Sequence, residues 1–188
     1  MGVDDNTTMI ELLQQELPQG SFEPAPSADG MMTIYVPREQ LVATMQTLRD
    51  SLGFRLLADI VAVDYLPREP RFEVLYLLAN IGTAGITPSR LRVKVRVPGN
   101  DPSVPTLTGL WRMADWAERE LWDMFGIHID GHKDLRRILM PEDWEGFPQR
   151  RDYPVQIKQP VKTYEPLQVS EEEFLANIEA SRDRSRRP

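Results

Sequence analysis

The stretch Glu118–Pro154 reads ERELWDMFGIHIDGHKDLRRILMPEDWEGFPQRRDYP and holds the most unusual chemistry of the chain. It contains both histidines and mixes acids with bases and aromatic residues. Its first part is typical of the end of an amphipathic helix, which Gly126 stops. A short link runs to Leu135, and a charged and aromatic ribbon, residues 136–153, follows with several prolines and glycines. The segment therefore predicts a helix that ends against a non-helical ribbon.

Composition restricts the class of protein. The chain has 188 residues and 41% hydrophobic residues, which is enough for one domain with its own core plus an appendage. No apolar run approaches the roughly 18 residues of a membrane span. The first residues lack the basic segment that a secretory signal requires, so such a signal is not expected. The absence of cysteine excludes disulfides, thiolate zinc sites and iron–sulfur ligation by this chain. A net charge of −7 without a dominant basic patch argues against nucleic acid as a partner.

Periodicity predicts a small α+β domain with a mixed or antiparallel sheet and packed helices. Thr8 and Glu11 have capping-box spacing, which predicts a helix from Thr8 to about Leu17. The unbroken apolar run after Glu73 predicts a strand that is buried on both faces. The full set of expected elements is a helix at 8–17, a linker at 21–30, a strand at 31–36, a helix at 37–52, strands at 54–65, 71–81 and 90–97, loops at 82–88 and 98–106, and a helix from 106 or 108 to Gly126.

Residues 90–97 alternate between apolar and basic side chains, which is the clearest strand pattern in the chain. The basic residues then form a row on one face. One interpretation is a basic docking stripe for a partner. The other is the solvated outer face of an antiparallel sheet, and we favour it because sheets with one wet face commonly have this pattern.

The chain changes character at Tyr153. Pro154, Pro160 and Pro166 predict an extended arm. A short helix with Ser170 as its N-cap, acids in its first turn and arginines near its end is expected to follow. Such an arm cannot form its own core, so it is expected to lie along another protein. The predicted organisation is an N-terminal helix and linker at 1–30, the α+β domain at 31–152 and a partner-binding arm at 153–188.

Two candidate chemistries fall in the central stretch. His128 and His132, with Asp123 or Asp130, are a possible metal site, although the flanking glycines favour loop histidines bonded to backbone or to a carboxylate. Glu118, Glu120 and Asp123 have the residue types of a general acid and base. A structural ion network explains the same carboxylates, because neighbouring arginines would pair with them and lower their pKa values. Those arginines are Arg119, Arg136, Arg137, Arg150 and Arg151.

No phosphate loop, dinucleotide fingerprint or nucleophile elbow is present in the sequence. The residues by themselves therefore favour a component of an assembly over an enzyme with its own active site.

The central stretch closely resembles the signature of the thirty-kilodalton subunit family of proton-pumping NADH–quinone oxidoreductase (respiratory complex I). The residues that carry the resemblance are Glu118-Arg119-Glu120, Asp123-Met124-Phe125, His132, Arg136 and Ile138-Leu139, the continuation RRILMPEDWEGFPQRRDYP, and the run Leu56–Pro67. The resemblance covers roughly Leu41–Pro154. Lys133, where the family usually has proline, and Phe147, where it usually has histidine, depart from the pattern.

The resemblance implies a non-catalytic scaffold subunit of the peripheral, quinone-reducing arm, which supports electron transfer from NADH through iron–sulfur clusters to quinone. It implies that this chain binds no cofactor and that the parent complex carries FMN and the clusters. The implied partners are the large quinone-pocket subunit and the subunit with the terminal cluster, on the cytoplasmic side of the inner membrane. The implied signature and interface residues are Glu118, Arg119, Glu120, Asp123, His132, Arg136, Arg137, Arg150, Arg151, Asp152 and Tyr153.

Three alternatives stay open at this point. The same signature also suits the corresponding subunit of a related ferredoxin-dependent or hydrogenase-type complex. A stand-alone hydrolase or isomerase would use Glu118, Glu120 or Asp123 with His132, and it requires a pocket and a raised carboxylate pKa. A soluble adaptor outside energy metabolism would share the fold alone.

Overall fold

The computed structural model describes residues 3–82, 88–154, 170, 172–176 and 178. The chain divides into two units, Met1–Tyr153 and Pro154–Pro188. In the second unit, residues 172–176 are helical, and the N–H of Glu173 donates to Oγ of Ser170 at 3.2 Å, as the predicted cap requires. Residues 155–169, 171, 177 and 179–188 of the predicted arm, like loop residues 83–87, lie outside the described residues. Among the helices of the described part, none is long and apolar enough to cross a membrane.

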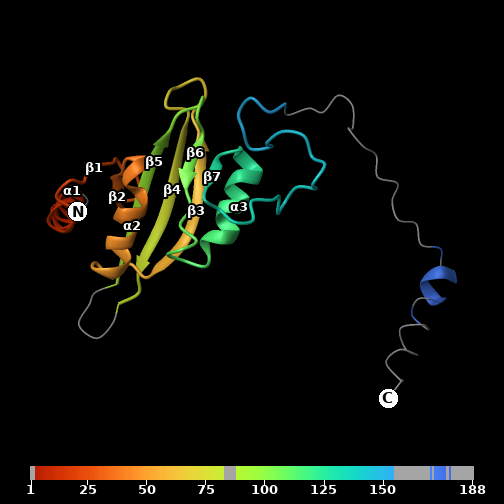
Figure 1. Cartoon of the computed structure of the whole chain (residues 1–188), viewed down its shortest axis with the longest axis horizontal. Coiled ribbons are helices and arrows are strands. Elements are labelled where there is room, and N and C mark those ends of the chain that lie inside the picture. The colour runs from red at the N-terminus through yellow and green to blue at the C-terminus, as the bar shows by residue number, and fades with distance from the viewer. Residues whose placement is uncertain (1–2, 83–87, 155–169, 171, 177, 179–188) are drawn as a thin grey trace, which may run out of the picture. The chain divides into compact units, whose positions relative to one another are not determined.

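The first unit is built on a five-stranded sheet with the order β1-β2-β5-β4-β3 (Figure 1). The strands are β1 Glu23–Pro24, β2 Met32–Tyr35, β3 Leu56–Asp64, β4 Phe72–Asn80 and β5 Ser89–Val97. The β2–β5 pair is parallel and the other pairs are antiparallel. This mixed sheet with packed helices confirms the predicted fold class.

One face of the sheet carries the core. Phe72, Val74 and Tyr76 of β4 lie beside Val97, Val95 and Val93 of β5, and all six side chains are buried. Residues between them, such as Leu75 and Leu77, are only half-buried on the opposite face. The prediction that this strand is buried on both faces is therefore wrong, because the described helices cover only one side of the sheet.

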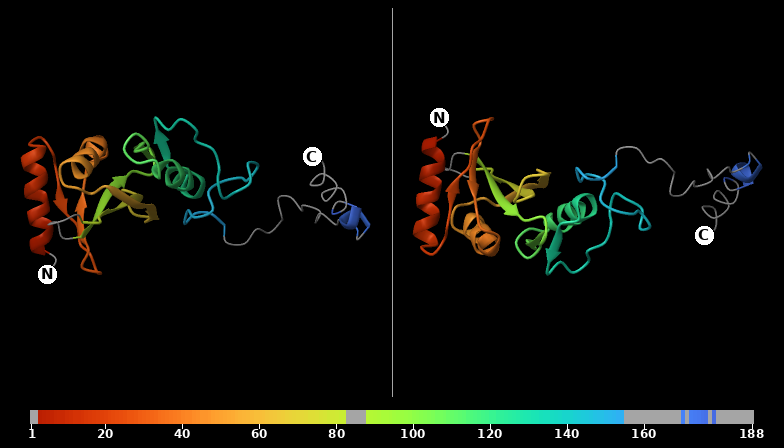
Figure 2. Two further views of the ribbon diagram at one scale, coloured as in Figure 1. Left: turned by 90° about the horizontal axis from the view of Figure 1, so that it is seen from below. Right: turned by 90° about the horizontal axis from the view of Figure 1, so that it is seen from above.

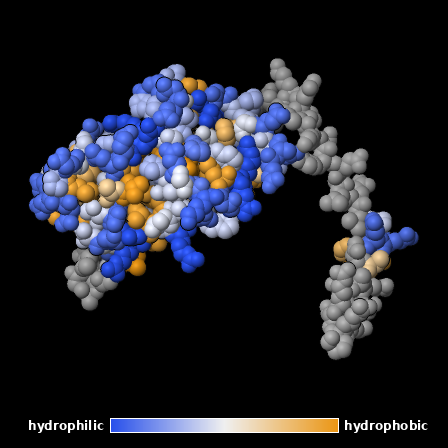
Figure 3. All heavy atoms as spheres, viewed as in Figure 1, coloured by the Kyte–Doolittle hydropathy of each residue, from blue (hydrophilic) through white to orange (hydrophobic). Residues whose placement is uncertain are grey.

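The helices are α1 Val3–Glu16, the 3-10 turn η1 Arg38–Gln40, α2 Leu41–Asp50 and α3 Ala114–Phe125. Figure 2 shows α2 and α3 on the same side of the sheet, where their apolar side chains join one buried cluster. Hydrophilic side chains cover most of the first unit in the view of Figure 3, and hydrophobic ones show between them. The core therefore lies between the sheet and these two helices, and Met9 and Leu13 of α1 also belong to it.

Two helix starts differ from the predictions. Helix α1 begins before Thr8, so Thr8 lies inside the helix and is not its cap. Helix α3 begins at Ala114 and not near Thr106 or Thr108. The N–H of Leu107 and the hydroxyl of Thr106 both donate to the carboxylate of Glu118, which holds this segment outside the helix.

Short strands also occur in segments predicted to be loops or linker. Strand β6, Ser103–Pro105, pairs in parallel with β7, His128–Asp130. Strand β1 lies in the predicted linker and pairs with β2. Strands of two or three residues have no visible sequence pattern, because distant pairing stabilises them.

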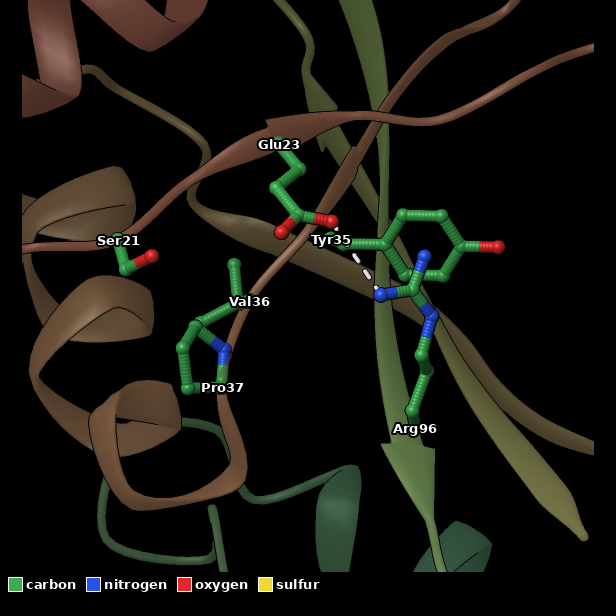
Figure 4. A pocket seen from close by; sticks show the side chains of 6 residues that line it. All are labelled: Ser21, Glu23, Tyr35, Val36, Pro37 and Arg96. Carbon is green, nitrogen blue, oxygen red and sulfur yellow. Dashed lines mark hydrogen bonds and ion pairs between the residues drawn. The ribbon is translucent and has the colours of Figure 1, made fainter. Parts of the chain in front are cut away.

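Three of the four basic residues in the row on β5 form ion pairs within the chain, and the fourth, Arg90, is exposed. Arg92 pairs with Asp29, Lys94 with Glu73, and Arg96 with Glu23. Figure 4 shows the ion pair between Arg96 and Glu23. The guanidinium carbon of Arg96 also lies 3.7 Å from the centre of the Tyr35 ring. Acids from other segments thus pair with much of the row, which does not suit an open docking stripe. The row still lies on the more solvated face of β5, as the favoured interpretation expects, because the apolar residues between its members are buried.

Candidate functional site

The ribbon after α3 is organised around the carboxylate of Asp123, whose side chain is fully buried on the helix. Its Oδ2 accepts hydrogen bonds from the N–H groups of Ile138, Leu139 and Met140 at 3.0, 2.8 and 2.9 Å. Its Oδ1 accepts from Arg137 at 2.5 Å. Burial alone would raise the pKa of Asp123, but these hydrogen bonds outweigh it and lower the pKa. The carboxylate therefore stays ionised and anchors the first part of the ribbon.

Arg137 joins the beginning of the ribbon to its middle. Its Nη2 donates to the carbonyl oxygens of Trp144 and Gly146 at 2.8 and 3.1 Å. The guanidinium carbon lies 5.7 Å from the ring centres of both Trp122 and Phe147. One side chain thus crosslinks the helix and two turns of the ribbon, which makes this part of the ribbon a fixed surface.

Arg119 and Arg150 bind backbone carbonyls instead of the expected carboxylates. Arg119 donates to the carbonyl oxygens of Arg136 and Arg137 at 3.2 and 3.1 Å. Arg150 donates to those of Phe125 and Gly126, at the C-terminal end of α3. The last carbonyls of a helix have no partner within the helix and attract a cation.

The predicted arginine–carboxylate network is therefore present only in part, because most of these arginines bind other groups. Of the predicted arginines and carboxylates, Arg137 and Asp123 form an ion pair. Arg136 pairs instead with Asp134, and the backbone N–H of Arg151 donates to Asp64. Glu120 is exposed on α3.

Glu118 and His132 meet inside the fold. The Nδ1 of His132 accepts from the N–H of Asp134 at 3.1 Å, so its Nε2 is left to donate to the carbonyl of Asp115 at 3.3 Å. The Oε2 of Glu118 lies 3.9 Å from this Nε2. Burial raises the pKa of Glu118, although the hydrogen bonds from Thr106 and Leu107 oppose the rise.

The raised pKa of Glu118 is a feature that the stand-alone enzyme alternative requires. However, its side chain is only 2% exposed and that of His132 is fully buried. Both side chains are therefore enclosed by the protein, which does not suit direct contact with a substrate. No cluster of three or more potential metal ligands occurs in that part of the chain, and His132 is bonded to backbone as the favoured interpretation expects.

Sequence reasoning missed one important group. Arg71, which precedes β4, lies between Asp64 at the end of β3 and Asp152 at the end of the ribbon, at 2.7 and 2.8 Å. Asp152 was among the predicted residues, but nothing in the sequence connects it to Arg71. Tyr153 stacks on Trp144, with ring centres 6.5 Å apart. The structure thus places most of the predicted residues on or against α3, and it connects Arg151 and Asp152 to the end of the sheet.

Comparison with known proteins shows the family to which a chain with this fold belongs. Residues 34–159 match the family described as "Respiratory-chain NADH dehydrogenase, 30 Kd subunit". The chain belongs to this family. The resemblance in the central stretch is therefore confirmed, and Phe147, which departs from the usual pattern, is accommodated between Trp122 and Arg150.

Several family members are similar over long stretches. The chain is 45% identical to an NADH-quinone oxidoreductase subunit of Roseiflexus sp. (strain RS-1), over 85% of this chain and 90% of the relative. It is 46% identical to an NADH-quinone oxidoreductase subunit of Rhizobium meliloti (strain 1021), over 72% and 73%. This 30 Kd family member is thus similar to subunits of a respiratory oxidoreductase along most of its length.

Solved structures agree with this assignment. A trypsin-resistant fragment of Nqo5 is 36% identical, with a TM-score of 0.55, over 69% of this chain and 98% of the fragment. A chain of an archaeal membrane-bound sulfane sulfur reductase has a TM-score of 0.66 at 22% identity, over 80% of this chain and 86% of that one. The second likeness shows a shared fold.

Proposed function

We propose that this 30 Kd family member is a non-catalytic scaffold subunit in the peripheral, quinone-reducing arm of an NADH–quinone oxidoreductase. The observation that carries the proposal is the use of its charged residues. Asp123, Arg119 and Glu118 are buried and bonded to the chain's own backbone and side chains. The side chain of Arg137 is only 11% exposed and is bonded in the same way. Groups used like this shape a surface and are not left free for a reaction.

The proposed partners are the large quinone-pocket subunit and the subunit that carries the terminal iron–sulfur cluster. The ribbon offers them a shape that is fixed before binding, which reduces the entropy cost of association. The exposed Phe174 and Leu175 in the helix of the second unit support a role of the arm in binding a protein. In this proposal, other subunits hold FMN and the clusters, and the chain reaches the cytoplasmic side of the inner membrane only through them.

The test is an affinity purification of the tagged full chain from its own cells in mild detergent. We expect a large, iron-rich complex that reduces quinone with NADH. An iron-free particle near the chain's own 21.6 kDa would remove the proposal. If the complex is large but reduces its acceptor with ferredoxin and not NADH, the chain is instead the equivalent subunit of a related complex.

A matched variant separates scaffold from catalyst. Glu118→Gln keeps the size of the side chain but removes its ionisable group. We expect the purified complex with this variant to keep its quinone reductase activity per complex. A loss of turnover in a complex of normal size and iron content would favour a catalytic carboxylate instead.

A further inference from the structure

Arg71 holds two carboxylates that belong to distant parts of the chain. Its Nε and Nη2 donate to the two oxygens of Asp64 at 3.0 and 2.7 Å. Its Nη1 and Nη2 donate to the two oxygens of Asp152 at 3.1 and 2.8 Å. Paired two-point contacts of this kind are among the strongest ion pairs that proteins form, and they define orientation as well as distance.

The sheet end of this group is buried and rigid. Asp64 closes β3 and its side chain is 1% exposed, while that of Arg71 is 11% exposed. Asp64 also accepts from the N–H of Leu66 at 3.0 Å and from the N–H of Arg151 at 2.9 Å. Burial alone would raise the pKa of Asp64, but the hydrogen bonds from Arg71 and from the N–H groups of Arg151 and Leu66 lower it to about 2. The carboxylate is therefore ionised and fully bonded at neutral pH.

The ribbon end is held by successive residues. Arg151 contributes its N–H and Asp152 its carboxylate to the same turn between β3 and β4. The N–H of Tyr153 donates to the carbonyl of Arg150 at 3.1 Å, and its ring stacks on Trp144. A Cβ on Gly146 would lie 2.9 Å from the Tyr153 ring, so the ring fits closely over this glycine. The chain is thus held up to the last residue of the first unit.

Pro154 begins the second unit directly after this group. We infer that Asp64, Arg71 and Asp152 form a clamp that sets the point at which residues 154–188 leave the domain, so that the arm can engage a partner subunit. The assembly step rests on the proposed function, whereas the clamp does not. A fixed starting point raises the effective concentration of the arm at its binding site, because a released ribbon would lengthen the tether.

The clamp can be opened without damaging the core. The side chain of Asp152 is half-exposed, so Asp152→Asn removes one charge at the surface end while Arg71 keeps Asp64. Asp134→Asn is the matched control, because Asp134 is a similarly exposed acid in the link before the ribbon and is paired with an arginine. Its partner Arg136 is only two residues away, so that pair joins no distant segments. Asp152→Glu retains the charge and tests rescue.

The first readout is hydrogen exchange of the isolated full chain. In Asp152→Asn we expect roughly tenfold faster exchange in residues 144–153, since a charge-assisted contact to the sheet is lost. Strands β3 to β5 should exchange as in the wild type, and so should all of Asp134→Asn. Unchanged exchange in the ribbon of Asp152→Asn would refute the clamp.

The second readout is assembly in the chain's own cells. We expect Asp152→Asn to recover severalfold less of the large complex than the wild type. Asp134→Asn should recover as much as the wild type, and Asp152→Glu should restore part of the loss. Faster exchange with wild-type recovery would show that the arm does not need the clamp. If the wild-type chain itself elutes alone, the proposed function and the assembly step fail, while the exchange result still decides the clamp.

Discussion

At the scale of single residues, Asp123 shows how one buried charge shapes a loop. Its carboxylate lies beneath three consecutive backbone amides and the guanidinium of Arg137. Backbone amides that point at one oxygen form a concave site for an anion. Here the chain supplies the anion itself, so the loop depends on a helix residue that precedes it.

Substitution of this residue should weaken the whole unit. Asp123→Asn removes the charge that faces Arg137. The NH2 group of the asparagine would also face backbone N–H groups or Arg137, which are themselves hydrogen-bond donors. We expect a loss of about 3 kcal/mol in the free energy of unfolding, because one partner of a buried pair is removed. Urea denaturation measures it. Glu120→Gln on the exposed side of α3 is the control, with an expected change within about 0.5 kcal/mol. Equal losses in both variants would contradict this account.

Asp64 predicts how stability responds to acid. Its pKa in the folded chain is about 2, against an ordinary value of 3.8. Since the folded value is depressed, its contribution is present above pH 3.8 and disappears as the pH falls toward 2. The stability difference between wild type and Asp64→Asn should therefore shrink by about 2 kcal/mol over this range. A difference that stays constant during acid titration of both proteins would rule this out.

At the scale of elements, the end of α3 depends on close packing between Gly126 and Phe147. Gly126 has a φ of 67°, which is the left-handed conformation common at helix ends. A Cβ at this position would overlap the Phe147 ring, which also contacts Trp122 and Arg150. Gly126 therefore ends the helix and also leaves the space in which Phe147 of the ribbon packs.

Gly126→Ala should lower the stability of the chain, both because of the left-handed backbone conformation and because of the close packing of Phe147. We expect it to destabilise the chain by more than about 1 kcal/mol, since alanine is strained there and the ring must move. Gly109→Ala is the control, because no atom lies within 4 Å of its Cβ position and its φ is not in the left-handed range. Thermal unfolding of the two variants compares them. A Gly126→Ala protein as stable as Gly109→Ala would disprove the packing argument.

At the scale of the whole molecule, the first unit should be independent of the second. Among the described residues, the buried hydrophobic cluster runs from Met9 to Ile129, and the partly buried Leu135 and Met140 pack against it. We expect a chain that ends at Pro154 to unfold with the free energy of the full chain, to within about 0.5 kcal/mol, but to lose its partners in affinity purification. Cooperative denaturation and the size of the eluted particle measure the two effects. A truncated chain that still elutes in the large complex would show that the arm is dispensable.

Most of the sheet and α2 were predictable because their signals are local. Leu41, Met45 and Leu48 recur at helical spacing and are fully buried. Residues 91–97 alternate as a strand with one buried face requires. The error on β4 has a physical reason, since Leu75 and Leu77 are apolar whether or not anything covers them. The residue type shows that a side chain is apolar, but it does not show whether another element packs against it.

The sequence by itself determined the fold class, the family and the stretch in which the important charges lie, because periodicity and spacing are properties of the local backbone. Only the tertiary structure decided which charges meet. Arg71 and Asp152 are 81 residues apart, and Arg119 and Arg150 bind carbonyls that carry no side-chain signature. Hydrogen-bond partners are chosen by distance and direction in space, and these exist only once the sheet and α3 have packed together.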